Sequence, residues 1–97
     1  MFDTMIIGAG VTGMAIAHFL SKTELSVLVV EAKEDVAEGA TKANSAIVHA
    51  GYDAKPGTLK AKYNVEGNRM YPALAKQLGF PFINNGSLIL CFKKEDR

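Results

Sequence analysis

Three glycines near the start of the chain have the spacing that is typical of a loop that binds the diphosphate of a dinucleotide. Residues 8–13 read GAGVTG, and an acid, Glu31, follows the last glycine at close to the separation of about 20 residues that this pattern requires. Gly8 permits a tight turn, Gly10 lets the backbone approach a diphosphate, and Gly13 lets the next helix lie close to its strand. The Glu31 carboxylate would accept hydrogen bonds from an adenosine ribose. The spacing therefore predicts a dinucleotide site.

The elements around these glycines have the order that such a site needs. The apolar residues before the turn predict a buried strand over 2–7, the next residues a helix from 11 to 21 or 22, and 26–31 a second strand. A crossover helix makes the two strands parallel. The helix N-terminus then offers unpaired N–H groups and its positive dipole end to a diphosphate. The alternative, a glycine-rich turn in an ordinary α/β protein, leaves the terminal acid unexplained.

The acid limits which dinucleotides are expected to bind, and the overall composition limits the expected class of protein. An acid at the tip of the second strand repels a 2′-phosphate, which favours FAD or NAD over NADP. The net charge of +1 over 97 residues gives no basic face for nucleic acid, and the single cysteine excludes a disulfide framework and a zinc site built on cysteines. No apolar run approaches the roughly 20 residues that span a bilayer. These features predict a cytoplasmic protein.

The middle of the chain is polar and rich in small residues. Residues 32–40 predict a short helix or turn that ends at Gly39, and hydroxyl and amide side chains are dense over 41–45. These polar groups could contact phosphate or ribityl oxygens, and the small residues over 46–52 would let the backbone pass close to a flat ring. The alternative for 41–45 is a surface turn with local side-chain caps.

The last third of the chain predicts one long helix and a hairpin. Thr58 is the expected N-cap and Gly79 the expected end of the helix, with a kink or break at Pro72. Asn85-Gly86 is a strong hairpin signal between two strand-like runs. A polar run over 93–97 follows with no closing element, and a βαβ unit binds only the AMP half of its ligand well. The chain is therefore expected to be the N-terminal piece of a larger enzyme.

A longer stretch of sequence resembles a known family. The segments NSAIVHAGY over 44–52, KPGTLKA over 55–61 and EGNR over 66–69 are similar to the D-amino-acid-oxidase-like flavoprotein superfamily, in its glycerol-3-phosphate dehydrogenase and L-2-hydroxyglutarate oxidase branch. The resemblance implies an α/β fold with a Rossmann-like FAD-binding βαβ unit, the N-terminal part of a larger two-domain flavoprotein. Residues 1–97 would be the first portion of a glutathione-reductase-like FAD-binding domain. Residues 80–97 would begin the hairpin that leads into a substrate domain.

The resemblance also implies where FAD lies. The adenosine and pyrophosphate end would be held by the glycine turn and the acid, namely Gly8, Ala9, Gly10, Gly13, Glu31 and Ala32. The polar segment would line the pyrophosphate and ribityl chain through Thr41, Lys42, Asn44 and Ser45. His49 and Gly51 would lie beside the isoalloxazine.

The implied reaction is oxidation of a secondary alcohol on a small anionic metabolite, first sn-glycerol 3-phosphate to dihydroxyacetone phosphate and second L-2-hydroxyglutarate. Hydride passes to flavin N5, and the electrons go on to a quinone, another electron carrier or oxygen. His49 has the chemistry of a base or flavin-tuning group, although a packing or hydrogen-bonding role is the commoner one for such a histidine. Peripheral membrane association and a homo-oligomer of the parent enzyme are both compatible with this resemblance.

Two other interpretations stay open at this point. The chain could act only as a nucleotide-binding module that is inactive as isolated, or it could be a generic NAD-dependent dehydrogenase, which leaves the segments over 44–61 unexplained. Two further residues carry no predicted chemistry. His18 is expected on the surface or in packing, and Cys91 is expected to be a small buried hydrophobe.

Overall fold

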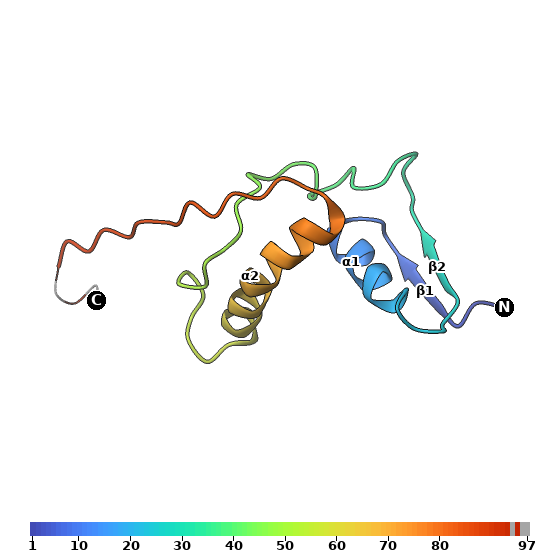
Figure 1. Ribbon diagram of the computed structural model, residues 1–97, viewed down its shortest axis with the longest axis horizontal. Coiled ribbons are helices and arrows are strands. Elements are labelled where there is room, and N and C mark those ends of the chain that lie inside the picture. The colour runs from blue at the N-terminus through green and yellow to red at the C-terminus, as the bar shows by residue number, and fades with distance from the viewer. Residues whose placement is uncertain (94, 96–97) are drawn as a thin grey trace. The chain divides into compact units, whose positions relative to one another are not determined.

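The computed structural model describes residues 1–93 and 95, in which four elements follow one another in the order β1, α1, β2, α2 (Figure 1). Its contacts divide the chain into two compact units, Met1–Ala46 and Ile47–Arg97. The first unit contains both strands and α1, and the second contains α2. No helix in the described part of the chain is long and apolar enough to cross a membrane.

The first unit is the predicted βαβ unit. Strand β1 covers Thr4–Ile7, helix α1 covers Val11–Leu20, and strand β2 covers Val27–Val30. The strands are parallel, with Thr4 opposite Val27 and Ile7 opposite Val30, and α1 contacts both of them. This order confirms the α/β fold and the dinucleotide-binding topology. Each strand is one or two residues shorter at its ends than the sequence predicts.

A side-chain clamp joins the two strands at their N-terminal ends. The Asp3 carboxylate accepts hydrogen bonds from the backbone N–H of Ser26 (2.8 Å) and from its hydroxyl (2.6 Å). In return, the backbone N–H of Asp3 lies 3.0 Å from the Ser26 hydroxyl oxygen. The Ser26 hydroxyl, followed by its N–H, holds the pKa of the Asp3 carboxyl below the ordinary value of 3.8. The clamp therefore favours the ionised carboxylate.

Replacing Asp3 with alanine is expected to lower the urea midpoint of unfolding at neutral pH and to have less effect in acid. Because the folded-state pKa is depressed, the stability from this carboxylate is present above the ordinary pKa and is lost as the pH falls through the folded value. Urea titrations of the wild type and of Asp3→Ala, from neutral pH to about pH 2, measure the gap between their unfolding midpoints. Glu24→Ala, at an exposed acid in the nearby turn, is the control. A gap that persists undiminished in acid would contradict the role of the ionised clamp.

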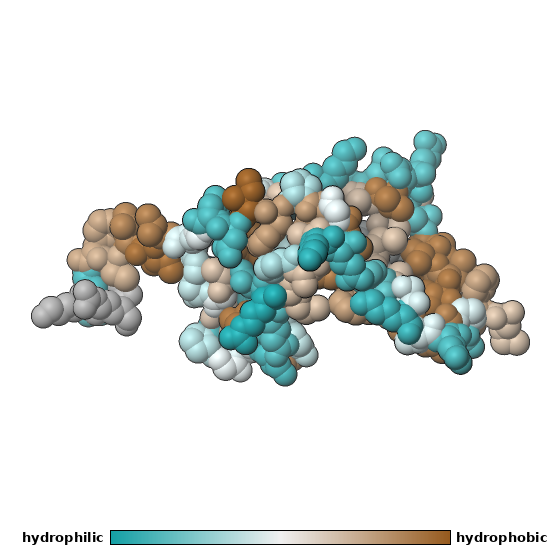
Figure 2. All heavy atoms as spheres, in the orientation of Figure 1, coloured by the Kyte–Doolittle hydropathy of each residue, from teal (hydrophilic) through white to brown (hydrophobic). Residues whose placement is uncertain are grey.

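Only one face of β1 is covered. The side chain of Ile6 is buried, whereas those of Met5 and Ile7 are 59% and 85% exposed. Successive side chains point to opposite faces of a strand, and in this unit α1 is the helix that packs on the strands. The expectation of a wholly buried strand is therefore wrong, because burial of a parallel sheet needs a cover on both faces. Figure 2 shows hydrophobic residues at the surface of the chain.

Helix α2 (Leu59–Leu78) begins and ends where the sequence predicts. The hydroxyl oxygen of Thr58 accepts the N–H of Ala61 at 3.2 Å, and Gly79 takes a left-handed conformation with φ of +72°. Both caps follow from local chemistry, an oxygen acceptor at the N-cap and a residue without Cβ after the last turn. Of the kink or break expected at Pro72, the break does not occur. Proline removes only one hydrogen bond from the ladder, and the helix continues to Leu78.

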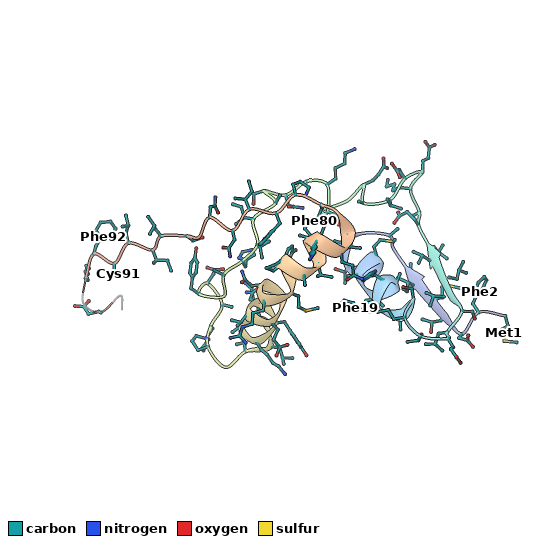
Figure 3. All side chains as sticks on the ribbon, viewed as in Figure 1. Met1, Phe2, Phe19, Phe80, Cys91 and Phe92 are labelled. Carbon is teal, nitrogen blue, oxygen red and sulfur yellow. The ribbon has the colours of Figure 1, made fainter. Side chains whose placement is uncertain are left out.

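The expected hairpin is not formed. Residues 80–93 contain no strand, although Gly86 has the positive φ of +72° that a tight turn uses. Phe82 stacks on Tyr71 of α2 with 5.9 Å between ring centroids, but beyond it Leu88 and Phe92 are 96% and 86% exposed. A two-stranded hairpin is marginal in water without a surface to pack on, which accounts for the extended chain. Figure 3 shows Phe92 at the end of this segment.

Of the short helix or turn expected over residues 32–40, the structure has the turn: these residues form bends and turns. One smaller expectation is wrong. Cys91 is exposed rather than buried, because the strand that would have buried it is not formed. Of the polar run over 93–97, residues 94, 96 and 97 lie outside the described residues.

Candidate dinucleotide-binding site

The glycine turn leads directly from β1 into the N-terminus of α1. Gly8 has φ of +101°, a conformation that glycine adopts readily, and its N–H donates to the Val30 carbonyl at 2.7 Å. Ala9 is almost fully buried. Gly10 is the N-cap of α1 and has no side chain with which to cap it. The first N–H groups of α1 therefore need acceptors from elsewhere in the chain or from a ligand.

Gly13 lies where α1 comes closest to the end of β1. A Cβ built on Gly13 would overlap the Gly8 carbonyl oxygen and lie 3.2 Å from Cγ2 of Ile6. The carbonyl belongs to the backbone of the turn, so it has no flexible side chain that could move aside. This is the close helix–strand packing for which the spacing of the glycines predicts a residue without a side chain.

Glu31 reaches back from the end of β2 to the glycine turn. Its Oε2 accepts the N–H of Ala9 at 2.7 Å, and its Oε1 accepts the N–H of Lys33 at 3.0 Å. The Ala9 N–H, and after it the Lys33 N–H, hold the pKa of the Glu31 carboxyl below its ordinary value of 4.5. The structure thus brings the predicted acid and the predicted turn together. The neighbouring Ala32 is exposed.

Thr41 caps α1 from outside the helix. Its hydroxyl oxygen accepts the N–H of Val11 at 2.9 Å, and a Cβ on Gly10 would lie 3.2 Å from the same oxygen. The N–H of Ala37 also donates to the Ala9 carbonyl at 3.0 Å. Residues 37–41 are therefore tied to the glycine turn. The residue type of Thr41 suggests a cap, but no local spacing indicates which helix it caps.

Replacing Thr41 with valine is expected to destabilise the first unit by about 1 kcal/mol, the usual cost of losing a helix cap. Valine keeps the branched shape and removes the acceptor, so the Val11 N–H loses its partner. Urea unfolding measures the loss, and hydrogen exchange at the Val11 amide should become faster. Thr41→Ser keeps the hydroxyl and is the control. Equal stability of the valine and serine variants would show that the bond contributes little.

The rest of the polar segment forms a capped turn. The Asn44 amide nitrogen donates to the carbonyls of Ala40 (3.0 Å) and Thr41 (2.7 Å), and its oxygen accepts the N–H of Ala46 at 2.8 Å. Lys42 and Ser45 are exposed. The local caps are thus present, as the surface-turn alternative expects. They shape the segment that Thr41 attaches to the glycine turn.

In the second unit, His49 and Gly51 lie on a segment that contacts α2. The His49 carbonyl accepts a hydrogen bond from the side-chain amide of Asn68 at 3.1 Å. Gly51 has φ of +101°, and a Cβ there would lie 2.6 Å from Cγ2 of Val65. The sequence singles out His49 and Gly51 and includes Asn68 in the EGNR segment of the family resemblance, but it does not indicate that Asn68 and His49, 19 positions apart, are hydrogen-bond partners.

The other histidine of the chain lies in α1. His18 packs edge-on against Phe19 with 5.5 Å between ring centroids, in agreement with the packing role expected for it. Within residues 1–93 and 95, no three His, Cys, Asp or Glu side chains are grouped to hold a metal ion.

The first unit fits the adenosine and diphosphate end of a dinucleotide. It has a turn without side chains at Gly8 and Gly10, a helix N-terminus directly behind it, and an ionised acid at the tip of the second strand. The helix N–H groups suit a diphosphate and the acid suits a ribose. The fold and the site therefore define a dinucleotide-binding βαβ unit.

The comparison with known proteins places this unit in a family. The model of the DAO family, described as FAD dependent oxidoreductase, matches residues 3–97. The chain belongs to this family, whose cofactor is FAD, as the sequence resemblance implies.

Three relatives illustrate the similarity. A glycerol 3-phosphate dehydrogenase of Caloramator mitchellensis is 55% identical over 99% of this chain and 20% of its own length. A glycerol 3-phosphate oxidase of Mycoplasma pneumoniae is 38% identical over 98% of this chain and 25% of its own. A mitochondrial L-2-hydroxyglutarate dehydrogenase of Homo sapiens is 35% identical over 98% of this chain and 21% of its own. The chain thus spans a fifth to a quarter of their lengths.

Proposed function

We propose that this chain is the N-terminal FAD-binding part of an enzyme that oxidises sn-glycerol 3-phosphate to dihydroxyacetone phosphate. The observation that carries the proposal is the 55% identity to a glycerol 3-phosphate dehydrogenase over almost the whole chain, against 35% to an L-2-hydroxyglutarate dehydrogenase. FAD, when bound, supplies flavin N5 as the hydride acceptor. The remaining steps fall to the protein, which binds and orients both molecules and removes a proton.

The residues that we propose for FAD follow the geometry of each segment. The glycine turn and the acid hold the adenosine and the diphosphate, through Gly8, Ala9, Gly10, Gly13, Glu31 and Ala32. The capped turn follows the pyrophosphate and ribityl chain, through Thr41, Lys42, Asn44 and Ser45. The support is that Glu31 and Thr41 accept the N–H groups of Ala9 and Val11, which ties the acid and the polar segment to the glycine turn.

His49 is the residue that we propose as the base or flavin-tuning group. A neutral imidazole can accept a proton from an alcohol near neutral pH. His49 is exposed, and its backbone is held by Asn68, so the ring is accessible while its attachment point is fixed. Gly51, two residues later, is the proposed neighbour of the isoalloxazine.

The test of the proposed substrate is anaerobic reduction of the intact enzyme. Glycerol 3-phosphate is expected to bleach the flavin absorbance rapidly, and L-2-hydroxyglutarate to leave it unchanged at the same concentration. The second candidate, L-2-hydroxyglutarate oxidation, is supported by the relatives with that name. Bleaching by L-2-hydroxyglutarate alone would reverse the assignment. An intact protein that binds no FAD would overturn both.

The 97-residue chain by itself is expected to bind FAD weakly or not at all. Apolar residues such as Ile7 and Phe92 are exposed, and we propose that further parts of the enzyme cover them, with 80–97 leading toward a substrate domain. A βαβ unit alone provides only part of the walls around the cofactor. Equilibrium dialysis of the purified chain against FAD measures this. Stoichiometric retention of flavin would contradict the expectation.

Other properties of the whole enzyme stay predictions. The proposed electron acceptor is a quinone, another electron carrier or oxygen, and the proposed location is the cytoplasm.

A further inference from the structure

Two contacts fasten the segment containing His49 to one face of α2. The first is the hydrogen bond from the Asn68 amide to the His49 carbonyl, at 3.1 Å. The second is the contact between Gly51 and Val65, in which the glycine lies so close that a Cβ would come within 2.6 Å of Cγ2 of Val65. Val65 and Asn68 are three positions apart and therefore neighbours on the same helix face.

The two contacts constrain the backbone on either side of residue 50. A hydrogen bond fixes the carbonyl of His49, and close packing fixes Gly51, whose φ of +101° also restricts which residue can stand there. Because the imidazole rotates only about its χ angles once its backbone is held, fixing both positions limits where the ring can lie. This gives Gly51 a role in packing on the helix that is separate from any approach to a flavin.

Helix α2 is suited to serve as a fixed support. It is 20 residues long and capped at both ends, by the Thr58 hydroxyl and by Gly79 in the left-handed conformation. Tyr71 on the same helix also stacks on Phe82, which anchors the chain that follows. Side chains mounted on such an element hold a geometry more precisely than those on a loop.

We propose that Asn68 is a positioning residue, which acts through the His49 backbone to set the orientation of the imidazole toward the flavin. The inference rests on the proposed function, because it takes His49 to lie beside the isoalloxazine. Asn68 itself does not touch the reacting atoms in this arrangement. Its side-chain amide, which holds the His49 carbonyl, is the group on which the effect depends.

The test compares Asn68→Ala with Asn64→Ala in the intact, flavin-loaded enzyme. Asn64 lies one turn earlier on α2, and its amide nitrogen is buried without a hydrogen-bond partner in the structure. Asn64→Ala therefore removes an amide of the same type without breaking a hydrogen bond that this nitrogen donates. Asn68→Ala is expected to lower kcat about tenfold with little change in KM or FAD content, because a misplaced catalytic group slows the chemical step. The Asn64 variant is expected to keep kcat within about twofold of the wild type.

A second readout does not depend on turnover. Nuclear magnetic resonance of the His49 backbone and imidazole should show increased disorder in Asn68→Ala and in the isosteric Asn68→Asp, which lacks the amide donor. The pH profile of kcat should also shift in both Asn68 variants. Unchanged His49 resonances and an unchanged kcat with full FAD content would overturn the inference. If the intact wild-type enzyme binds no FAD, the proposed function is refuted. The His49 resonances of the Asn68 variants would then still test whether Asn68 holds the His49 backbone.

Discussion

Replacing Gly13 with alanine is expected to abolish FAD binding by the intact enzyme and to destabilise the unit that contains the strands. The added Cβ would overlap the carbonyl oxygen of Gly8 and crowd Ile6, so α1 must move away from β1. Overpacking of this kind costs about 1–3 kcal/mol, and the displaced helix would no longer present its N-terminus at the turn. Urea unfolding and the flavin absorbance of the purified protein measure the two effects.

Gly67 provides a matched control for this substitution. It lies inside α2, and a Cβ built on it would meet no atom within 4 Å. Gly67→Ala is therefore expected to stabilise the protein by about 1 kcal/mol, the difference in helix propensity between the two residues. The same substitution is thus expected to lower the stability of the protein at Gly13 and to raise it at Gly67. A Gly13→Ala protein with normal stability and normal flavin content would contradict the packing argument.

Replacing Glu31 with glutamine is expected to weaken FAD binding by about tenfold or more, since hydrogen bonds to a charged group are the stronger kind. Glutamine keeps the shape of the side chain, but only one of its two terminal atoms is an acceptor, whereas the Glu31 carboxylate receives the N–H of Ala9 with one oxygen and that of Lys33 with the other. Titration of the apoenzyme with FAD, followed by flavin fluorescence, measures the change in affinity.

The pH dependence of this affinity separates the charge of Glu31 from its shape. The pKa of the Glu31 carboxyl lies below 4.5, so the carboxylate is ionised throughout the neutral range and its contribution is lost only as the pH falls through the depressed value. Wild-type affinity should therefore be constant near neutrality and decrease in acid. The glutamine variant should lack the part of this decrease due to Glu31. Glu34→Gln, at an exposed acid nearby, should behave like the wild type.

Thr41 and Glu31 hold the same turn, so substitutions of the two residues are expected to influence each other. Thr41 and Glu31 each accept a backbone N–H of the same turn, at Val11 and at Ala9. Because Thr41→Val frees the Val11 N–H at the turn that Glu31 also holds, it should lower FAD affinity as well, and its effect on affinity should not add to that of Glu31→Gln. The two residues together hold the turn before any ligand is present.

The order of residues was enough to predict the succession of the elements and both ends of α2. The glycine turn between strand and helix, the N-cap at Thr58 and the left-handed Gly79 follow from interactions among residues within a few positions of one another. Such local preferences can be predicted directly from the residue types and their spacing. The parallel direction of the two strands follows from the crossover helix between them. The family resemblance carried by residues 44–69 was likewise a property of the sequence, and the family match confirmed it.

Contacts between residues far apart in the sequence depend on the tertiary fold. The Thr41 cap on Val11 joins residues 30 positions apart, and the bond from Asn68 to His49 joins residues 19 apart. No spacing rule encodes such pairs, because they depend on where the chain returns in space. The exposed face of β1 and the missing hairpin have the same origin, since burial and strand pairing need a second surface that an apolar pattern alone does not supply.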